Sequence, residues 1–281
     1  MWAFAEVLRP ANCFMAAAAV PLGAAVASGS DLGPDVLPAA ATVFLICGAG
    51  NVVNDYYDRD IDAVNAPERP IPSGRLSPQG AQAYAIILFL AGVGLAATIN
   101  TLALSIATLA AVLLAAYAHS GKRMGIWGNL IVSLLVGLTI VYGGVAVAAD
   151  NTTALRRVGV LGMCAMLANL GRELVKDIED LEGDLTKDAR SVPAVHGPEH
   201  ARTLATIALG AAIVLGFLPV YLGFLTSTYY IVAILIADAL FAAAAAQLFQ
   251  GELTSDSAGR SQRIIKFGMF CALIAFLVGN R

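Results

Sequence analysis

Two groups of acidic residues have a spacing that would place several oxygen ligands on one side of a helix. In the first group, Asn54, Asp58 and Asp62 recur every four residues, so a continuous helix rotates only about 40° from one to the next. The second group lies within residues 171–184, where four acidic residues share a helical sector about 60° wide. These are Glu173, Asp177, Asp180 and Asp184. Each group therefore predicts a carboxylate-rich face at a helix end.

Crowded carboxylates repel one another and are costly near a membrane, and divalent cations remove that conflict. Magnesium prefers oxygen ligands, keeps several waters, and usually takes one or two carboxylates plus substrate phosphates. Arginine and lysine residues are interleaved with both acidic groups. This combination favours a magnesium-bridged diphosphate over the other interpretation of such a charge run, a solvated acidic loop.

The elements that would position these residues are apolar helices. The chain has 281 residues, of which 58% are hydrophobic and only 13% charged, whereas a soluble domain carries about 25% charged residues. A hydrocarbon core about 30 Å thick requires roughly 20 apolar helical residues. Charge-free segments predict nine transmembrane helices, at 10–30, 36–54, two within 76–121 that meet at 100–101, 124–149, 158–171, two between 203 and 249, and 267–280. The expected fold class is an all-α membrane protein, a single domain of one nine-helix bundle over residues 1–281.

Basic residues give the expected orientation of this bundle. If the N-terminus lies in the cytoplasm, all of the 17 basic residues fall on the inner side except Arg156, Arg157 and Arg281. The positive-inside rule predicts such a bias. We therefore expect a multi-pass protein of the cell membrane, with its N-terminus and both acidic groups on the cytoplasmic side.

A degenerate internal duplication is also indicated. Each acidic group ends the second helix of a predicted four-helix set, and similar segments follow the two groups: RPIPS at 69–73 and RSVP at 190–193. Internal repeats of this kind are common in membrane folds. The two acidic groups are then expected to be counterparts.

A prenyl diphosphate would fit both the polar and the apolar parts of this chain. Its diphosphate would lie at the acidic groups and its hydrocarbon chain among the helices. Metal ions and basic side chains would neutralise the departing diphosphate, and aromatic faces such as Tyr117, Tyr142 or Phe44 could stabilise positive charge at the allylic carbon, although packing is their commoner role. A transporter is disfavoured because its acids would mark an ion path rather than gather at one face. A scaffold protein would have no use for two metal-binding faces.

Some residues carry weaker signals. His196 and His200 are four residues apart, but Pro198 between them disturbs helical geometry, so a loop or a helix start is expected there. Asp238 lies inside the predicted eighth helix; an intramembrane acid is a functional candidate by default, yet a protonated or hydrogen-bonded packing residue is favoured because Asp238 is far from the acidic groups. Asn12 could support the site or cap the first helix.

These residues resemble the UbiA-type intramembrane prenyltransferase superfamily, whose members have nine transmembrane helices and two aspartate-rich motifs. The first motif is matched by Asn54-x3-Asp58-x3-Asp62 and the second by Asp177-x2-Asp180-x3-Asp184. Four segments look most like the archaeal digeranylgeranylglyceryl phosphate synthases: LRPANC at 8–13, residues 54–77, KRMGIWGN at 122–129, and RELVKDIEDLEGD at 172–184. Menaquinone and chlorophyll-type prenyltransferases share much of this sequence, so a prenyltransferase acting on an aromatic acceptor is the alternative.

The resemblance implies magnesium-dependent transfer of a geranylgeranyl group from geranylgeranyl diphosphate to the free hydroxyl of geranylgeranylglyceryl phosphate, which forms the second ether bond of archaeal membrane lipids. It implies that magnesium is held by Asn54, Asp58, Asp62, Asp177, Asp180 and Asp184. It also implies that Arg69, Ser73 and Arg75 contact phosphate or order their loop. Four more basic residues are candidates for the two phosphate-bearing head groups: Lys122, Arg123, Lys176 and Arg190. The lipid bilayer is the expected surroundings, and no nucleic-acid partner is expected.

Overall fold

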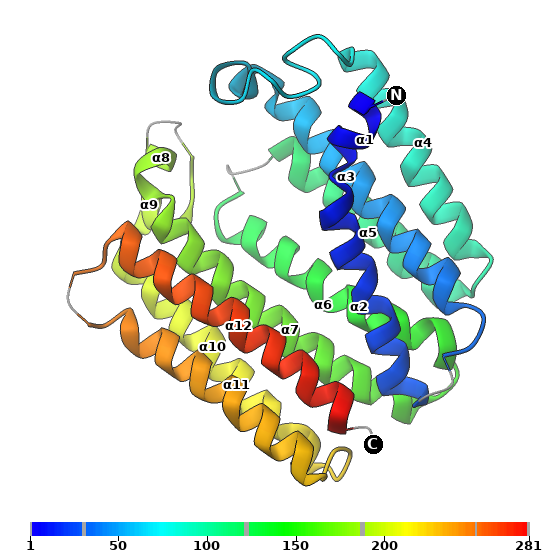
Figure 1. Cartoon of the computed structure of the whole chain (residues 1–281), viewed down its shortest axis with the longest axis vertical. Helices are drawn as coiled ribbons and strands as arrows, with labels where there is room; N and C mark the ends of the chain where they lie inside the picture. Colours follow the sequence, from blue (N-terminus) through cyan, green and yellow to red (C-terminus); the bar gives the residue numbers. More distant parts are fainter. Residues whose placement is uncertain (1, 30–31, 121–123, 186–188, 251, 280–281) are drawn as a thin grey trace.

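The computed structural model describes residues 2–29, 32–120, 124–185, 189–250 and 252–279, and the regular secondary structure in these ranges is helical throughout. Within them, nine helices are long and apolar enough to cross a membrane (Figure 1). They are α2 (Pro10–Ser28), α3 (Val36–Asn65), α4 (Pro78–Ala97), α5 (Thr101–Ser120), α6 (Ile126–Ala148), α7 (Thr152–Glu179), α10 (Pro198–Tyr221), α11 (Thr228–Gln247) and α12 (Ser255–Gly279). Three short helices complete the fold: α1 (Trp2–Leu8), α8 (Leu181–Leu185) and α9 (Val192–His196). The expected all-α fold with nine candidate membrane spans is confirmed for these ranges.

Several helices are longer than the charge-free segments that predicted them. Helix α3 runs past residue 54 to Asn65, and α12 begins at Ser255 rather than at 267. Charged residues need not end a helix, so an absence of charge delimits the apolar span but not the helix. The turn expected at 100–101 is present. At this turn the Asn100 side-chain oxygen accepts a hydrogen bond of 2.8 Å from the N–H of Ala103, at the start of α5.

The bundle consists of two parts with a similar arrangement. In one, α3 packs against α2, α4 and α5; in the other, α7 packs against α6, α10 and α12, and α11 covers α10 and α12. Each helix that carries an acidic group therefore lies against the helix before it and the long helix after it (Figure 1). This arrangement agrees with the predicted internal duplication.

The two parts meet where α2 packs against α6. A side-chain carbon added at Gly23 would lie 1.8 Å from the backbone oxygen of Ile140, and one added at Gly143 would lie 2.0 Å from the backbone oxygen of Val20. Only glycine permits so close an approach of two helix backbones. These two glycines therefore permit the close packing of the two halves against each other.

Candidate active site

Both acidic groups lie at the same end of the bundle, at the C-terminal ends of α3 and α7 (Figure 1). A cavity of about 480 Å³ lies between α2, α3, α5, α6 and α7. Polar side chains line its mouth: Arg9, Asn51, Asn54 and Lys176. Its wall is otherwise mainly apolar and reaches Thr42, which is twelve residues before Asn54 and so about 18 Å farther along α3. The cavity therefore joins a charged mouth to a long apolar chamber.

The first acidic group lies on one unbroken helix, as its spacing predicted. Helix α3 continues to Asn65, so Asn54, Asp58 and Asp62 share one face. The Asn54 amide donates a hydrogen bond of 2.8 Å to Asp58 Oδ2. Asp62 is buried and accepts a bond of 2.5 Å from the Arg69 guanidinium. The three oxygen ligands predicted for this group are therefore brought together.

Two arginines neutralise this end of α3. Arg9 pairs with the buried Asp55, and the Arg69 guanidinium that binds Asp62 also lies 3.7 Å from Asp55. Partial burial alone would lower the pKa of Arg69, but its hydrogen bond to Asp62 and the nearby carboxylates of Asp55 and Asp58 raise it above the ordinary value. The cationic charge of Arg69 is thus held in place beside the first motif.

The loop after α3 is ordered by Ser73 and Arg75. The Ser73 hydroxyl donates a bond of 2.7 Å to the backbone oxygen of Arg69, and the Arg75 guanidinium binds Ser73 and both carboxylate oxygens of Glu6 on α1. Of the two roles implied for Ser73 and Arg75, these contacts favour ordering of the loop, which in turn supports Arg69.

The second acidic group does not lie on one continuous helix, so this expectation is corrected. Helix α7 ends at Glu179, Asp180 follows as its C-terminal cap, and Asp184 lies on the separate short helix α8. Asp184 is buried, whereas Asp180 is exposed and lies 3.9 Å from the Lys176 ammonium. The break turns Asp180 toward solvent, while Asp184 remains within electrostatic reach of Asp177.

Asp177 is oriented by an amide from another helix. The side chain of Asn129 on α6 donates a hydrogen bond of 2.8 Å to Asp177 Oδ2. On the same face of α7, Glu173 pairs with Arg172, whose guanidinium also donates to the Asn169 side chain at 3.2 Å. A polar network between α6 and α7 thus holds the second acidic group.

Tyr117 of α5 connects the two groups. It lines the cavity and lies within electrostatic reach of Asp58 from the first group and of Glu173 and Asp177 from the second. Tyr142 lines the same cavity, whereas Phe44 is absent from its lining and packs instead against Phe14, with ring centroids 4.9 Å apart. Tyr117 is therefore the aromatic residue best placed near the charged mouth.

The donor atoms at this mouth fit magnesium ions that share their coordination with a phosphate. Among the described residues, no three His, Cys, Asp or Glu side chains gather closely enough to hold a metal by themselves. Magnesium does not need such a cage, because it keeps waters and takes one or two carboxylates together with substrate phosphates. Asp58 on α3 and Asp177 on α7 both lie within electrostatic reach of Tyr117, which lines the cavity, and Arg9 and Arg69 lie beside the first group, so a metal–phosphate unit there could draw on both helices.

The other predicted binding residues have varied positions. Lys176 lines the cavity mouth. Asn12 is exposed in the first turn of α2, outside the cavity lining, and Arg190 is exposed in the segment after α8. The positions predicted at Lys122 and Arg123 lie outside the described residues.

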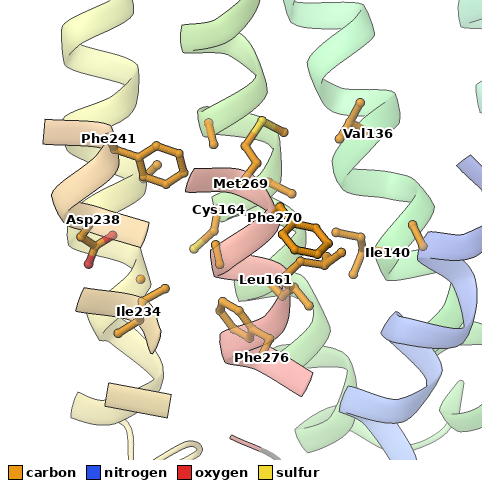
Figure 2. A pocket seen from close by; sticks show the side chains of 17 residues that line it. Val136, Ile140, Leu161, Cys164, Ile234, Asp238, Phe241, Met269, Phe270 and Phe276 are labelled. Carbon is orange, nitrogen blue, oxygen red and sulfur yellow. The ribbon is translucent and has the colours of Figure 1, made fainter. Parts of the chain in front are cut away.

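A second, smaller cavity contains Asp238. It measures about 220 Å³, and Val136 of α6 lines both this cavity and the larger one. Figure 2 shows Asp238 at its edge, with the sulfur of Cys164 turned toward it. The Asp238 carboxyl is buried, and neither oxygen has a hydrogen-bond partner in the part of the chain that the structure describes. The sequence favoured a protonated or a hydrogen-bonded packing residue at Asp238. Its carboxyl has no hydrogen bond to a described residue, so the hydrogen-bonded alternative is not found, and Asp238 lies outside the charged mouth.

The structure places two residues in the site to which the sequence patterns assigned no role there, Arg9 and Asn129. Arg9 has a left-handed backbone, with φ of 54°, at the break between α1 and α2. For an L-residue this conformation is uncommon and costs about 1–2 kcal/mol. Both residues lie in segments that carry the family resemblance, 8–13 and 122–129. Their contacts with Asp55 and Asp177 span 46 and 48 residues, which no local pattern reveals.

Comparisons with known proteins agree with this geometry. Residues 14–274 match the UbiA prenyltransferase family. A digeranylgeranylglyceryl phosphate synthase of Methanothrix thermoacetophila is 42% identical over 276 residues, which cover 98% of this chain and 97% of the relative. A solved structure from work on digeranylgeranylglyceryl phosphate synthase in membranes is 34% identical with a TM-score of 0.88, over 99% of this chain and 97% of that one.

A more distant structure has the same fold. It is a UbiA homologue from Archaeoglobus fulgidus, solved bound to DMAPP and Mg2+, with a TM-score of 0.71 at 17% identity over 96% of this chain and 99% of that one. The family match spans most of the described residues, and the synthase from Methanothrix thermoacetophila is similar from end to end. The chain therefore belongs to the UbiA prenyltransferase family.

Proposed function

We propose that this protein transfers a geranylgeranyl group from geranylgeranyl diphosphate to the free hydroxyl of geranylgeranylglyceryl phosphate. The observation that carries the proposal is that acidic residues of both α3 and α7 lie within electrostatic reach of Tyr117, which lines a mainly apolar cavity together with Arg9 and Lys176. Relatives named digeranylgeranylglyceryl phosphate synthase match over almost the whole chain, which favours this acceptor over an aromatic one.

The charged mouth would hold the diphosphate. We assign the magnesium ligands to Asn54, Asp58, Asp62, Asp177, Asp180 and Asp184. Magnesium bound there would neutralise the negative charge that develops on the departing diphosphate. The UbiA homologues solved with Mg2+ and a prenyl diphosphate support a divalent ion. Three side chains add positive charge nearby: Arg9 beside Asp55, Arg69 beside Asp62, and Lys176 beside Asp180.

The apolar chamber would hold the prenyl chain and exclude water from the reacting carbon. As the allylic carbon–oxygen bond breaks, the electron pair leaves with the diphosphate, and positive charge develops at the allylic carbon. Tyr117, which lines the cavity, would stabilise that charge through its aromatic ring. The acceptor hydroxyl oxygen then forms the ether bond, and its proton passes to the diphosphate or to water at the polar mouth.

The distribution of basic residues supports an orientation for the protein. We infer that residues 1–281 form one integral domain of the cell membrane, with the N-terminus and the charged mouth facing the cytoplasm. The basic residues at the mouth, such as Arg9, Arg69 and Lys176, then lie on the side that the positive-inside rule favours. Both phosphate-bearing substrates would enter from that face.

An acceptor panel tests the function. Purified protein is incubated with magnesium, geranylgeranyl diphosphate and either geranylgeranylglyceryl phosphate or an aromatic acceptor such as a hydroxybenzoate or a dihydroxynaphthoate, and products are identified by mass. We expect only the glyceryl phosphate to be prenylated, and only with magnesium present. Prenylation of the aromatic acceptor alone would replace this function by the alternative. A lack of any prenylated product would end the enzyme interpretation.

A further inference from the structure

The proposed reaction joins two lipids that each carry a phosphate group. The diphosphate of the donor can use the cations at the charged mouth, but the phosphate monoester of the acceptor brings further negative charge. A separate cavity with basic side chains lies near the second motif. We propose that this cavity binds the phosphate monoester of the acceptor. This inference rests on the proposed function.

The cavity, here called the α6–α10 pocket, measures about 470 Å³. It lies where the start of α6, residues 190–196 and the start of α10 come together. Its basic side chains are Arg190, His196 and His200, and apolar residues form the rest of its lining. A side-chain carbon added at Gly125, just before α6, would lie 2.8 Å from the backbone oxygen of Arg190. The turn before α6 therefore packs directly on the segment that carries Arg190.

The basic side chains of this pocket form no ion pair with a described acidic residue. Arg9, Arg69, Arg172 and Arg202 each pair with a carboxylate, whereas Arg190 has no ion pair in the described ranges. His196 and His200 likewise have no acidic partner there, and their ring centroids lie 5.5 Å apart. An arginine offers five N–H donors, and a neutral histidine offers one. A phosphate would satisfy donors from all three side chains.

Backbone and hydroxyl groups add further donors. Helix α6 begins at this pocket, and its N-cap residue, Gly125, supplies no side-chain cap. The first N–H groups of a helix favour an anion. Between the lining residues Arg190 and Val192, the Ser191 hydroxyl is buried without a hydrogen-bond partner in the described part of the chain. The Ser191 hydroxyl is thus a donor beside the pocket that no described protein atom satisfies.

The pocket is close enough to the reacting groups to orient the acceptor. Ile126 lines the pocket, and Asn129, which binds Asp177, follows it after about one helical turn, a rise of about 5 Å. In a glyceryl phosphate monoether, two carbon atoms separate the phosphate oxygen from the free hydroxyl. A phosphate held at the α6–α10 pocket would therefore direct the hydroxyl toward the second motif.

Variants of the pocket test the assignment by their effect on the acceptor alone. Arg190→Gln and the double variant His196→Gln/His200→Gln should each raise KM for geranylgeranylglyceryl phosphate about tenfold or more, because charge-assisted hydrogen bonds to phosphate are lost. The kcat and the KM for geranylgeranyl diphosphate should change less than about twofold, as should turnover of geranylgeranylglycerol, which lacks the phosphate. Arg190→Lys should retain most of the acceptor affinity.

Two further measurements keep the test decisive. Arg260→Gln, a change of an exposed arginine at the start of α12, is the matched control and should leave every KM unchanged. Inorganic phosphate should compete with the acceptor in the original protein and less effectively in Arg190→Gln. An active enzyme whose acceptor KM is unchanged in both pocket variants would overturn this inference alone. If the original protein transferred no prenyl group to any acceptor, the proposed function itself would fail.

Discussion

The two acidic motifs have similar sequences but are held in different ways. The first lies on an unbroken helix, and arginines pair with its buried acids: Arg9 with Asp55, and Arg69 with Asp62. The second is interrupted after Glu179, and its central Asp177 is held by an amide from Asn129. Within the described residues, Asp177 has no ion pair closer than 4.0 Å, and Asp180 has only the contact of 3.9 Å with Lys176.

This difference shows how one repeated motif can serve two purposes. In the first half, fixed cations stabilise a set of buried carboxylates and also present positive charge to a diphosphate. In the second half, Asp177 is oriented by the Asn129 amide and pairs with no described arginine, so a bound metal ion would supply its compensating charge. We therefore expect changes in the first half to affect stability and charge, and changes in the second half to affect positioning.

The largest expected effect comes from removing one carboxylate of either motif. Asp58→Asn and Asp177→Asn should each reduce kcat at least about 100-fold, because the departing diphosphate loses its compensating charge. Glu179→Gln is the matched control, since Glu179 binds Gln262 of α12 at 2.8 Å and does not line the cavity. Comparable losses in Asp177→Asn and Glu179→Gln would show a general disturbance of α7 rather than a role for the second motif.

The next largest effect distinguishes the two halves by stability. Arg9→Gln leaves the buried Asp55 with only the more distant Arg69, and unfolding should become easier by about 2–3 kcal/mol. Thermal unfolding in detergent would measure this as a lower Tm. Adding Asp55→Asn should recover part of the loss, because the uncompensated charge is then removed. An unchanged Tm in Arg9→Gln would mean that this ion pair does not stabilise the first half.

A smaller effect is expected from the amide that orients Asp177. Asn129→Ala should lower kcat about tenfold, with little change in Tm, because it removes one hydrogen bond to a charged acceptor. Steady-state kinetics and thermal unfolding on the same preparation separate these outcomes. A large fall in Tm with unchanged kcat would contradict the positioning role of the second half.

The smallest effect is expected in the loop after α3. The exposed Arg75–Glu6 pair lowers the pKa of Glu6, so its contribution is present at neutral pH and is lost as Glu6 becomes protonated at acidic pH. Because exposed pairs contribute little, Arg75→Ala should change activity by less than about twofold. A loss as large as that of Asp58→Asn would instead indicate that Arg75 contacts phosphate directly.

The sequence predicted the first half better than the second. The recurrence of Asn54, Asp58 and Asp62 every four residues required only that α3 continue, and it does. The break after Glu179 coincides with a contact to a distant part of the chain. The Ser255 hydroxyl of α12 donates a bond of 2.8 Å to the Glu179 backbone oxygen across 76 residues. A helical wheel of residues 173–184 has no information about that contact.

The sequence also did not reveal which side chains contact the acidic residues. Positive residues at the inner side are expected for topology alone, so the sequence could not separate Arg9, which contacts Asp55, from Arg260, which is exposed. Likewise, Asn129 is one polar residue in an apolar helix, and its contact with Asp177 is known only from the packing of α6 against α7. Nine helices and two motifs follow from local patterns, whereas the partners of each acid follow from the tertiary fold.

The most direct test measures binding of an unreactive geranylgeranyl diphosphate analogue with and without magnesium. The account predicts that magnesium tightens binding at least about tenfold in the original protein, and that Asp58→Asn or Asp177→Asn each removes this gain. The double variant should bind no more weakly than either single one, because both motifs act on one shared metal–diphosphate unit. A full magnesium effect in either single variant, or losses that simply add in the double variant, would contradict it.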